Sequence, residues 1–259
     1  MSDLIIESRR DAAAILQFNR PDKRNALSTD LLVELNERLV RLDDDDEVRG
    51  VILTGDKRAF SAGADLGGAL EAQSPRATDR LLMHFTVAND TIEAMTKPVV
   101  AAINGYCLTG GLEVAMACDV RIAGHDSRFG ITSAKIGSVA GAGGTQRLPR
   151  LVGEQWAKHL LFGCEFIDAE TARRIGLILE AMEPDAVLER AVALVARYAE
   201  QAPLSVWYAK KAVNTGMQLA MADALKFERE LTTVLWTTED RIEGMSAFLE
   251  KRKAQFKGQ

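Results

Sequence analysis

Two glycines and a glutamate stand together in the stretch Gly110-Gly111-Leu112-Glu113, just after a predicted buried strand. The first N–H groups of a helix have no partner within the helix, and the helix dipole favours negative charge there. Glycines let a ligand approach such N–H groups closely. We therefore predict that this stretch supplies half of an oxyanion hole. Glu113, in the first helical turn, is either a catalytic carboxylate or one that only stabilises the helix.

A second small-residue segment, AFSAGADL at residues 59–66, follows another predicted strand and is interpreted as a loop. Its side chains are too small to cover its backbone, so its N–H groups could bind a ligand oxygen. A plain tight turn that requires Gly63 is the alternative interpretation. Two such loops together favour stabilisation of an enolate or another oxyanion, a chemistry that suits a thioester carbonyl.

A glycine-rich stretch at residues 129–148 contains no acidic side chain, although the chain as a whole is rich in Asp and Glu. It does not match the dinucleotide-binding fingerprint, because Gln146 stands where the third glycine would be. It also lacks the Gly-Lys-Ser/Thr ending of a phosphate-binding P-loop. The chain has no G-x-S-x-G nucleophile motif. These absences leave the two small-residue loops and Glu113 as the candidates for chemistry.

Composition narrows the class of protein further. The chain has 259 residues, a hydrophobic fraction of 47% and a formal net charge of −5. This balance is typical of a soluble globular protein, and the negative charge argues against nucleic acid as a partner. No apolar run is long enough to span a membrane, and the N-terminus has no secretory signal, so we expect a cytoplasmic protein. The three cysteines and three histidines are scattered, so we expect no metal site.

The elements that must position these residues alternate between strands and helices, which is typical of α/β architecture. From about residue 168 the pattern becomes helical, over 168–174, 184–201, 203–220 and 221–256. We therefore predict a core at 1–195 and a helical region at 196–259. Before that region, strands are predicted at 4–7, 14–18, 48–55, 99–103 and 119–123, and helices after Ser28 as the N-cap and at 78–95 and 112–118.

In combination, these stretches resemble the crotonase superfamily, which contains the enoyl-CoA hydratases and isomerases. The similarity runs through nearly the whole chain and keeps the order of the family's motifs. The segments that carry it are Asn19-Arg20-Pro21, Asn25-Ala26-Leu27, AFSAGADL at 59–66, KPVVAAING at 97–105, GGLEVAMACD at 110–119, Phe129-Gly130, Gly137, GAGGTQRL at 141–148 and EGMSAFLEKR at 243–252.

The resemblance implies an α/β protein with the crotonase (ClpP-like) fold, a core of repeated ββα turns followed by a C-terminal helical region. Residues 1–195 would bind acyl-CoA, and residues 196–259 would mediate assembly into a homotrimer or a dimer of trimers. The implied substrate is an acyl-CoA thioester of fatty acid metabolism. No separate cofactor is implied, because coenzyme A enters as part of the substrate.

The resemblance also assigns roles to individual residues. The N–H groups of Ala64 and Gly110 would form the oxyanion hole, with Glu113 as the acid/base. The basic charges of Lys23 and Arg24 independently suit phosphates at the nucleotide end of coenzyme A. Residues expected to contact coenzyme A are Lys23, Arg24, Ala62, Asp65 and Leu66.

One position departs from the family pattern. Hydratases of this family carry a second glutamate in a Phe-Gly-x-Pro-Glu segment, but here Thr132 and Ser133 stand in place of Pro-Glu. A serine hydroxyl is a poor acid and a poor base at neutral pH, and general acid–base groups contribute about 10² to 10⁴-fold each. We therefore expect catalytic roles for Glu113 and Ser133, but not the rate of a two-glutamate hydratase.

Three functions stay open at this stage. Glu113 alone could serve hydration or isomerisation of an enoyl-CoA, with Ser133 binding water or a substrate hydroxyl. The protein could instead hydrolyse or decarboxylate an acyl-CoA, or it could bind acyl-CoA without turnover. Candidate side chains for the acyl pocket are Leu70, Leu82, Phe85 and Ile136, and Trp236 and Phe248 could close the pocket or pack at a subunit contact.

Overall fold

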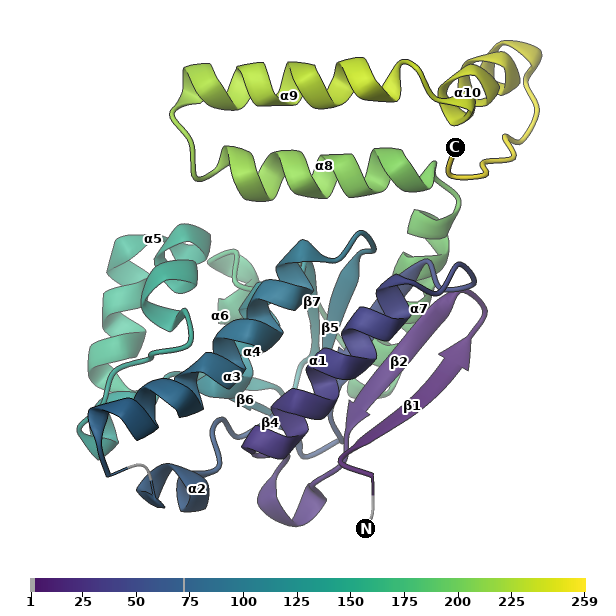
Figure 1. Cartoon of the computed structure of the whole chain (residues 1–259). Coiled ribbons are helices and arrows are strands. Elements are labelled where there is room, and N and C mark those ends of the chain that lie inside the picture. Colours follow the sequence, from purple (N-terminus) through teal and green to yellow (C-terminus); the bar gives the residue numbers. More distant parts are fainter. Residues whose placement is uncertain (1–2, 72) are drawn as a thin grey trace.

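A six-stranded sheet forms the middle layer of the body in the computed structural model, which describes residues 3–71 and 73–259 (Figure 1). The strand order is β1-β2-β3-β5-β7-β10. All neighbouring strands are parallel except the antiparallel hairpin of β1 and β2. The strands are β1 (Ile5–Arg10), β2 (Ala13–Phe18), β3 (Gly50–Thr54), β5 (Val99–Ile103), β7 (Val120–Gly124) and β10 (Glu180–Met182).

A second, smaller sheet has the order β4-β6-β8-β9, in which the first three strands are parallel. Along the chain, each of β3, β5 and β7 in the large sheet is followed by one strand of the small sheet and then by helical structure. This alternation confirms the repeated ββα core. The small sheet contains β4 (Ala59–Ser61), β6 (Tyr106–Leu108), β8 (Arg128–Gly130) and β9 (Ile167–Asp168).

Helices cover both faces of the large sheet and bury two separate apolar clusters. The side chains of Leu31, Leu35 and Leu39 recur at helical spacing and are fully buried, as their pattern predicts. Ser28 begins this helix as predicted, because its Oγ accepts a hydrogen bond from the N–H of Leu31 at 3.3 Å. One face carries α1 (Thr29–Asp43), α3 (Pro75–Ala94) and α4 (Gly110–Ala117), and the other carries α7 (Val187–Ala199).

Several sequence-based boundaries were wrong. The segment 59–66, expected to be a loop, begins with β4. Strands of three residues are too short to give a hydrophobic period, and so the pattern missed them. The helical segment 221–256 divides in two because Thr238 caps a new helix, with Oγ1 accepting from Arg241 N at 3.2 Å. The remaining helices are α2 (Leu66–Glu71), α5 (Gly144–Gly163), α6 (Ala169–Arg174), α8 (Pro203–Gly216), α9 (Met221–Leu235) and α10 (Glu239–Glu250), with short 3-10 turns η1 (Pro21–Lys23), η2 (Ser133–Ile136) and η3 (Pro184–Ala186).

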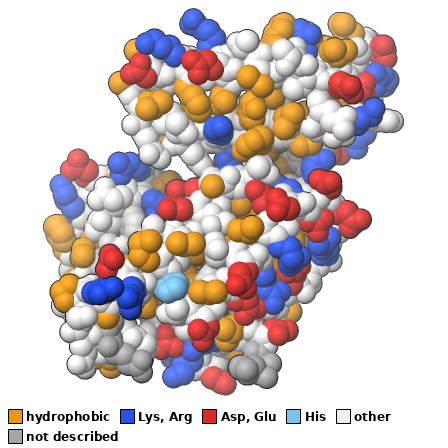
Figure 2. Space-filling model, in the orientation of Figure 1, with side chains coloured by type: hydrophobic (Ala, Val, Ile, Leu, Met, Phe, Trp, Pro, Cys, Tyr) orange, Lys and Arg blue, Asp and Glu red, His pale blue; other side chains and the backbone are white. Residues whose placement is uncertain are grey.

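The helices α8, α9 and α10 form a layer that stands apart from the body (Figure 1). Neither α8 nor α9 has a buried residue, and hydrophobic side chains are exposed across this layer (Figure 2). The predicted boundary between 195 and 196 falls inside α7, which packs on the sheet. The large exposed apolar side chains of this layer are Val213, Met217, Leu219, Met221, Leu225, Val234, Trp236, Ile242, Met245, Phe248 and Leu249.

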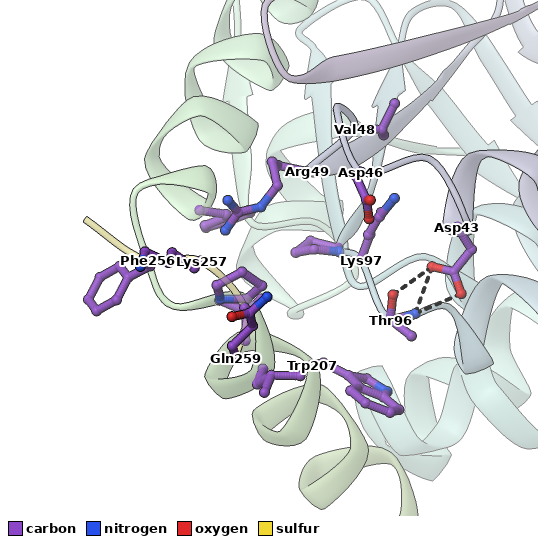
Figure 3. A pocket seen from close by; sticks show the side chains of 16 residues that line it. Asp43, Asp46, Val48, Arg49, Thr96, Lys97, Trp207, Phe256, Lys257 and Gln259 are labelled. Carbon is purple, nitrogen blue, oxygen red and sulfur yellow. Dashed lines mark hydrogen bonds between the residues drawn. The ribbon is translucent and has the colours of Figure 1, made fainter. Parts of the chain in front are cut away.

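A cavity of about 630 Å³ marks the seam between this layer and the body (Figure 3). Polar groups on the body side of this cavity are already hydrogen-bonded to one another. Asp43 accepts from both the N–H and the hydroxyl of Thr96 at 2.9 Å, and Lys97 Nζ donates to Leu42 O at 2.7 Å. None of the residues proposed for catalysis lines this cavity, which is formed by Asp43, Asp46, Val48, Arg49, Thr96, Lys97, Pro98, Tyr198, Pro203, Leu204, Val206, Trp207 and residues 256–259.

Lys210 of α8 clamps the C-terminal layer to the body. Its Nζ lies 2.9 Å from Asp119 Oδ2 and donates to Ile92 O at 2.8 Å. Only 7% of the Lys210 side chain and 22% of the Asp119 side chain are exposed. Removing one charge from such a pair leaves the other desolvated and unpaired, which is strongly destabilising.

We expect Lys210→Met to lower the free energy of unfolding by about 3 kcal/mol, because the Asp119 carboxylate would lose its cation. The measurement is urea unfolding followed by circular dichroism. Lys211→Met is the matched control, since Lys211 is exposed and its ammonium lies over the ring of Trp207. Equal stability of the two variants would contradict the clamp.

Candidate active site

The loops with candidate chemistry follow three adjacent parallel strands of the small sheet. Ala64 lies just after β4, Gly110 just after β6 and Ser133 just after β8. Because β4, β6 and β8 are parallel, their carboxyl ends lie at one edge of the sheet. The structure therefore brings Ala64, Gly110 and Ser133 to the same edge.

The N–H groups of Ala64 and Gly110 lie close together. A Cβ atom added to Gly110 would stand 3.2 Å from Ala64 N. Gly63 O and Asp65 N both bond to Leu27, at 2.8 and 3.0 Å, so the N–H of Ala64 is directed to the opposite side. Neither Ala64 N nor Gly110 N donates a hydrogen bond to another described residue. Two neighbouring N–H groups of this kind, one at the N-terminus of a helix, are the type of donor pair that can stabilise an oxyanion.

Thr109, the N-cap of α4, has a strained backbone with φ 42° and ψ −111°. Such a conformation in a residue other than glycine costs of order 1–3 kcal/mol and persists only where its surroundings hold it. Its N–H donates to Gly130 O at 2.9 Å, and its Oγ1 accepts from Thr132 N at 3.0 Å. The sequence analysis did not predict the hydrogen bond between Thr132 and Thr109. The residue that could have indicated it is Thr132, because a proline at that position would have no N–H to donate.

Glu113 is a buried carboxylate, with 3% of the residue exposed. Its Oε1 accepts hydrogen bonds from Ala142 N and Gly144 N, both at 2.8 Å. Gly144 is the first residue of α5, so the carboxylate caps the positive end of that helix. Its Oε2 accepts no hydrogen bond from residues that the structure describes, which leaves one oxygen available for a proton or a water.

Burial raises the pKa of Glu113 above its ordinary value. The N–H groups of Gly144 and Ala142 and the positive charge of Arg147 act in the opposite direction, but desolvation is the larger effect. A raised pKa brings a carboxyl closer to the pH at which it can both accept and return a proton. The environment of Glu113 therefore suits an acid/base.

The glycines of the 129–148 stretch allow the close contact of Glu113 with the N–H groups of Ala142 and Gly144. A Cβ atom on Gly144 would lie 2.7 Å from Ala140 Cβ and 2.9 Å from Glu113 Oε1. Gly143 has a φ of 108°, a conformation that disfavours any other residue. The lack of acidic side chains in this stretch also avoids repulsion of the Glu113 carboxylate.

Ser133 is 6% exposed and begins η2. Its Oγ has no hydrogen-bond partner in the part of the chain that the structure describes, so it can bind a ligand group or water. A hydroxyl brings no charge to the site. The position that the family pattern gives to a second glutamate is therefore neutral here.

The segment expected to hold coenzyme A lies beside the Ala64 loop. Lys23 and Arg24 are exposed on and after η1, and Arg24 O accepts from Ala62 N at 2.9 Å. Asp65 pairs with Arg20 at 2.7 Å, and this bond lowers the pKa of the Asp65 carboxyl. Leu66, at the start of α2, is 53% exposed. This set is contiguous in space, although Asp65 is already engaged within the chain.

Two of the candidate acyl-pocket residues lie against the reactive loops. The ring of Phe85 would be 2.9 Å from a Cβ atom on Gly110, and Leu82 would be 3.3 Å from one on Gly141. Leu70 and Ile136 are exposed, at 77% and 61%. The exposed Trp236 and Phe248 belong to the C-terminal layer, where the guanidinium of Arg241 lies 4.0 Å from the Trp236 ring centroid.

Within residues 3–71 and 73–259, no cluster of three or more His, Cys, Asp or Glu side chains is arranged to hold a metal ion. The helices in that part of the chain include none with the length and apolarity needed to cross a membrane.

Comparison with known proteins identifies relatives of the whole chain. The family described as enoyl-CoA hydratase/isomerase matches residues 8–259. A crotonyl-CoA hydratase of Syntrophomonas wolfei is 40% identical, over 97% of each chain. A 2,3-dehydroadipyl-CoA hydratase of Escherichia coli is 39% identical over the full length of both. The crystal structure of an enoyl-CoA hydratase from Bacillus anthracis superposes with a TM-score of 0.95, at 34% identity, and covers 99% of this chain and 100% of its own.

The raised pKa of Glu113 predicts a pH-dependent cost to stability. A carboxyl whose pKa is raised by burial in the folded state lowers stability as pH rises from its unfolded-state pKa to its folded-state pKa, because the unfolded state ionises first. Gln at this position cannot ionise but can accept the same two hydrogen bonds. We therefore expect the free energy of unfolding of Glu113→Gln, minus that of the wild type, to increase from acid to neutral pH. Urea unfolding at a series of pH values measures it, and a difference independent of pH would contradict the burial effect.

Proposed function

This chain belongs to the enoyl-CoA hydratase/isomerase family, and we propose that it hydrates a trans-2-enoyl-CoA with Glu113 as its acid/base. The observation that supports this most directly is the geometry of Glu113. One carboxylate oxygen accepts from two N–H groups and the other accepts from none of the described residues, while Ala64 and Gly110, which opens the same helix, offer two further N–H groups.

In this proposal the thioester carbonyl oxygen binds between Ala64 N and Gly110 N. Glu113 accepts a proton from water as the water oxygen bonds to the β carbon of the substrate. The electron pair of the double bond moves toward the carbonyl, and the two N–H groups stabilise the enolate oxygen. The protonated Glu113 then donates that proton to the α carbon, which completes the addition of water.

Ser133 acts as a neutral partner in this scheme. Its free hydroxyl can orient the attacking water or the product hydroxyl, but it cannot supply a second proton-transfer step at neutral pH. The same neutrality favours a second candidate function, in which the oxyanion site serves hydrolysis or decarboxylation of an acyl-CoA. A pure acyl-CoA binder is the third, although such a protein has no need for a buried carboxylate beside the thioester.

The nucleotide end of coenzyme A would lie along η1 and the Ala64 loop. Lys23 and Arg24 would face its phosphates. Ala62 O accepts no hydrogen bond from the described residues, so it is free for the adenine amino group. Asp65 would contribute indirectly, by holding Arg20 in place. The exposed apolar side chain of Leu66 would pack against the nucleotide end of coenzyme A. No separate cofactor is required for water addition.

We also propose a homotrimer or a dimer of trimers, formed through the C-terminal helices, and a cytoplasmic location. The exposed apolar side chains of α8, α9 and α10 support assembly, because a large exposed apolar surface favours burial against a partner. Light scattering tests it, and a stable monomer would contradict it.

Glu113→Gln is expected to lower kcat on a short trans-2-enoyl-CoA by about 10² to 10⁴-fold, because it removes the only proposed proton carrier. The assay follows loss of the conjugated double bond. Ser133→Glu, which restores the family's second carboxylate, is expected to raise the rate. Wild-type protein that leaves a panel of enoyl-CoAs unchanged but releases free coenzyme A would favour the hydrolase, and binding without any turnover would favour the binder.

Gly110→Ala keeps its N–H but should crowd the oxyanion off its donors, so we expect kcat/KM to fall by about 10² to 10³-fold, a loss as large as that of removing one oxyanion donor. Its methyl group would stand 2.9 Å from the ring of Phe85 and 3.2 Å from Ala64 N, where the substrate oxygen should bind. Gly163→Ala is the control, since its nearest contact at 3.6 Å is an ordinary one. Unimpaired turnover by Gly110→Ala would exclude this placement of the oxyanion.

A further inference from the structure

The guanidinium of Arg147 is packed against the turn that holds Glu113. Its Nη1 donates to Ala142 O at 3.2 Å. A Cβ atom on Gly143 would lie 1.9 Å from the same Nη1, so the guanidinium fills the space in which a side chain would stand. Arg147 therefore contacts two consecutive residues of the turn that supplies both N–H groups to Glu113.

Arg147 is itself fixed by α3. Its Nε donates to Glu93 Oε1 at 2.6 Å, and only 21% of its side chain is exposed. Asn89, fully buried on the same helix, donates its Nδ2 to Ala142 O at 2.9 Å. Two side-chain donors thus meet one carbonyl oxygen of the turn, and neither contacts Glu113 by a hydrogen bond.

We propose that Arg147 is a positioning residue for Glu113: held by Glu93, it fixes the 142–144 turn so that both N–H groups meet one carboxylate oxygen and the other stays free for proton transfer. This inference rests on the proposed role of Glu113. A misplacement of about 1 Å in a reacting group can cost about 100-fold in rate, so the turn is a sensitive point.

Charge adds a second, separable effect. The charged groups around Glu113 are Arg147 from α5 and, beyond it, Glu93 and Asp90 of α3, while Ser133 brings no charge from η2. The positive charge of Arg147 favours the ionised form of Glu113. A neutral residue at position 147 should therefore require a higher pH for Glu113 to act as a base.

The same contacts connect the site to the C-terminal layer. Asn214 of α8 donates its Nδ2 to Glu93 O at 3.1 Å, one residue along from the carbonyl of Ile92 that accepts from Lys210. Glu93 thus bonds to α8 through its backbone and to Arg147 through its side chain. Packing of α8 on the body therefore steadies the residue that holds Arg147.

The test compares Arg147→Gln and Arg147→Lys with the control Arg150→Gln. Arg150 is exposed and lies one turn further on the same helix, and among the described residues it bonds to Gln146 alone. In hydration assays across pH, we expect Arg147→Gln to lower kcat about 10- to 100-fold with little change in KM. The acidic limb of the pH–rate profile, where Glu113 becomes protonated, should move to higher pH. Arg147→Lys should lower kcat but leave the acidic limb of the pH–rate profile near its wild-type position. Arg150→Gln should match the wild type in both respects.

Wild-type kcat and pH limb in Arg147→Gln would overturn the proposal. A fall in activity that is explained entirely by the fraction of unfolded protein, with no shift of the acidic limb of the pH–rate profile, would also overturn the proposal. If the wild-type protein proves inactive in hydration, the titration of Glu113 still provides a readout. The pH-dependent stability difference between Glu113→Gln and its parent is then measured with and without Arg147→Gln. Because Arg147 favours the ionised form of Glu113, this rise should become larger and extend to higher pH in the Arg147→Gln background. An unchanged rise would overturn the proposed action of Arg147 on Glu113 independently of the reaction.

Discussion

Two backbone N–H groups at the start of α5 hold one oxygen of Glu113, and much of the site depends on this contact. Glu113 belongs to α4, so the carboxylate joins two successive turns of the ββα core. The contact compensates in part for burying a charge, since the helix terminus and Arg147 favour the ionised form. Desolvation still dominates, and the carboxyl is therefore both firmly placed and easily protonated.

The geometry of the small sheet gives this carboxylate its neighbours. Parallel strands end at one edge, and so Ala64, Gly110 and Ser133 come from three separate turns yet lie at the same edge of the sheet. Thr109 keeps a strained backbone to present the N–H of Gly110, and hydrogen bonds from Thr132 and to Gly130 retain it in that state. Strain held by surrounding contacts is common where a site must be organised before its ligand arrives.

The C-terminal layer is joined to the body by few but buried contacts. Lys210 and Asn214 bond to the last carbonyls of α3, where a helix leaves its C=O groups without partners. The layer thus depends on the body for its position, while its own apolar side chains stay exposed. The layer of α8, α9 and α10 is therefore firmly attached to the body and still exposes apolar side chains that a partner could bury.

The sequence by itself determined the α/β architecture, the helix that begins with Gly110-Gly111 and the candidacy of Glu113. Those features are local: helical periodicity, glycines after strands and a glutamate in the first turn can be read along the chain. The resemblance to the crotonase superfamily added the repeated ββα turns and the candidacy of Ala64 and Ser133. Only the tertiary structure decided which residues meet. Arg147, Asn89 and the Thr109–Thr132 pair act through contacts between segments distant in sequence, and the three-residue strands leave no period to detect. Burial, which sets the pKa of Glu113, likewise arises only when separate helices pack around it.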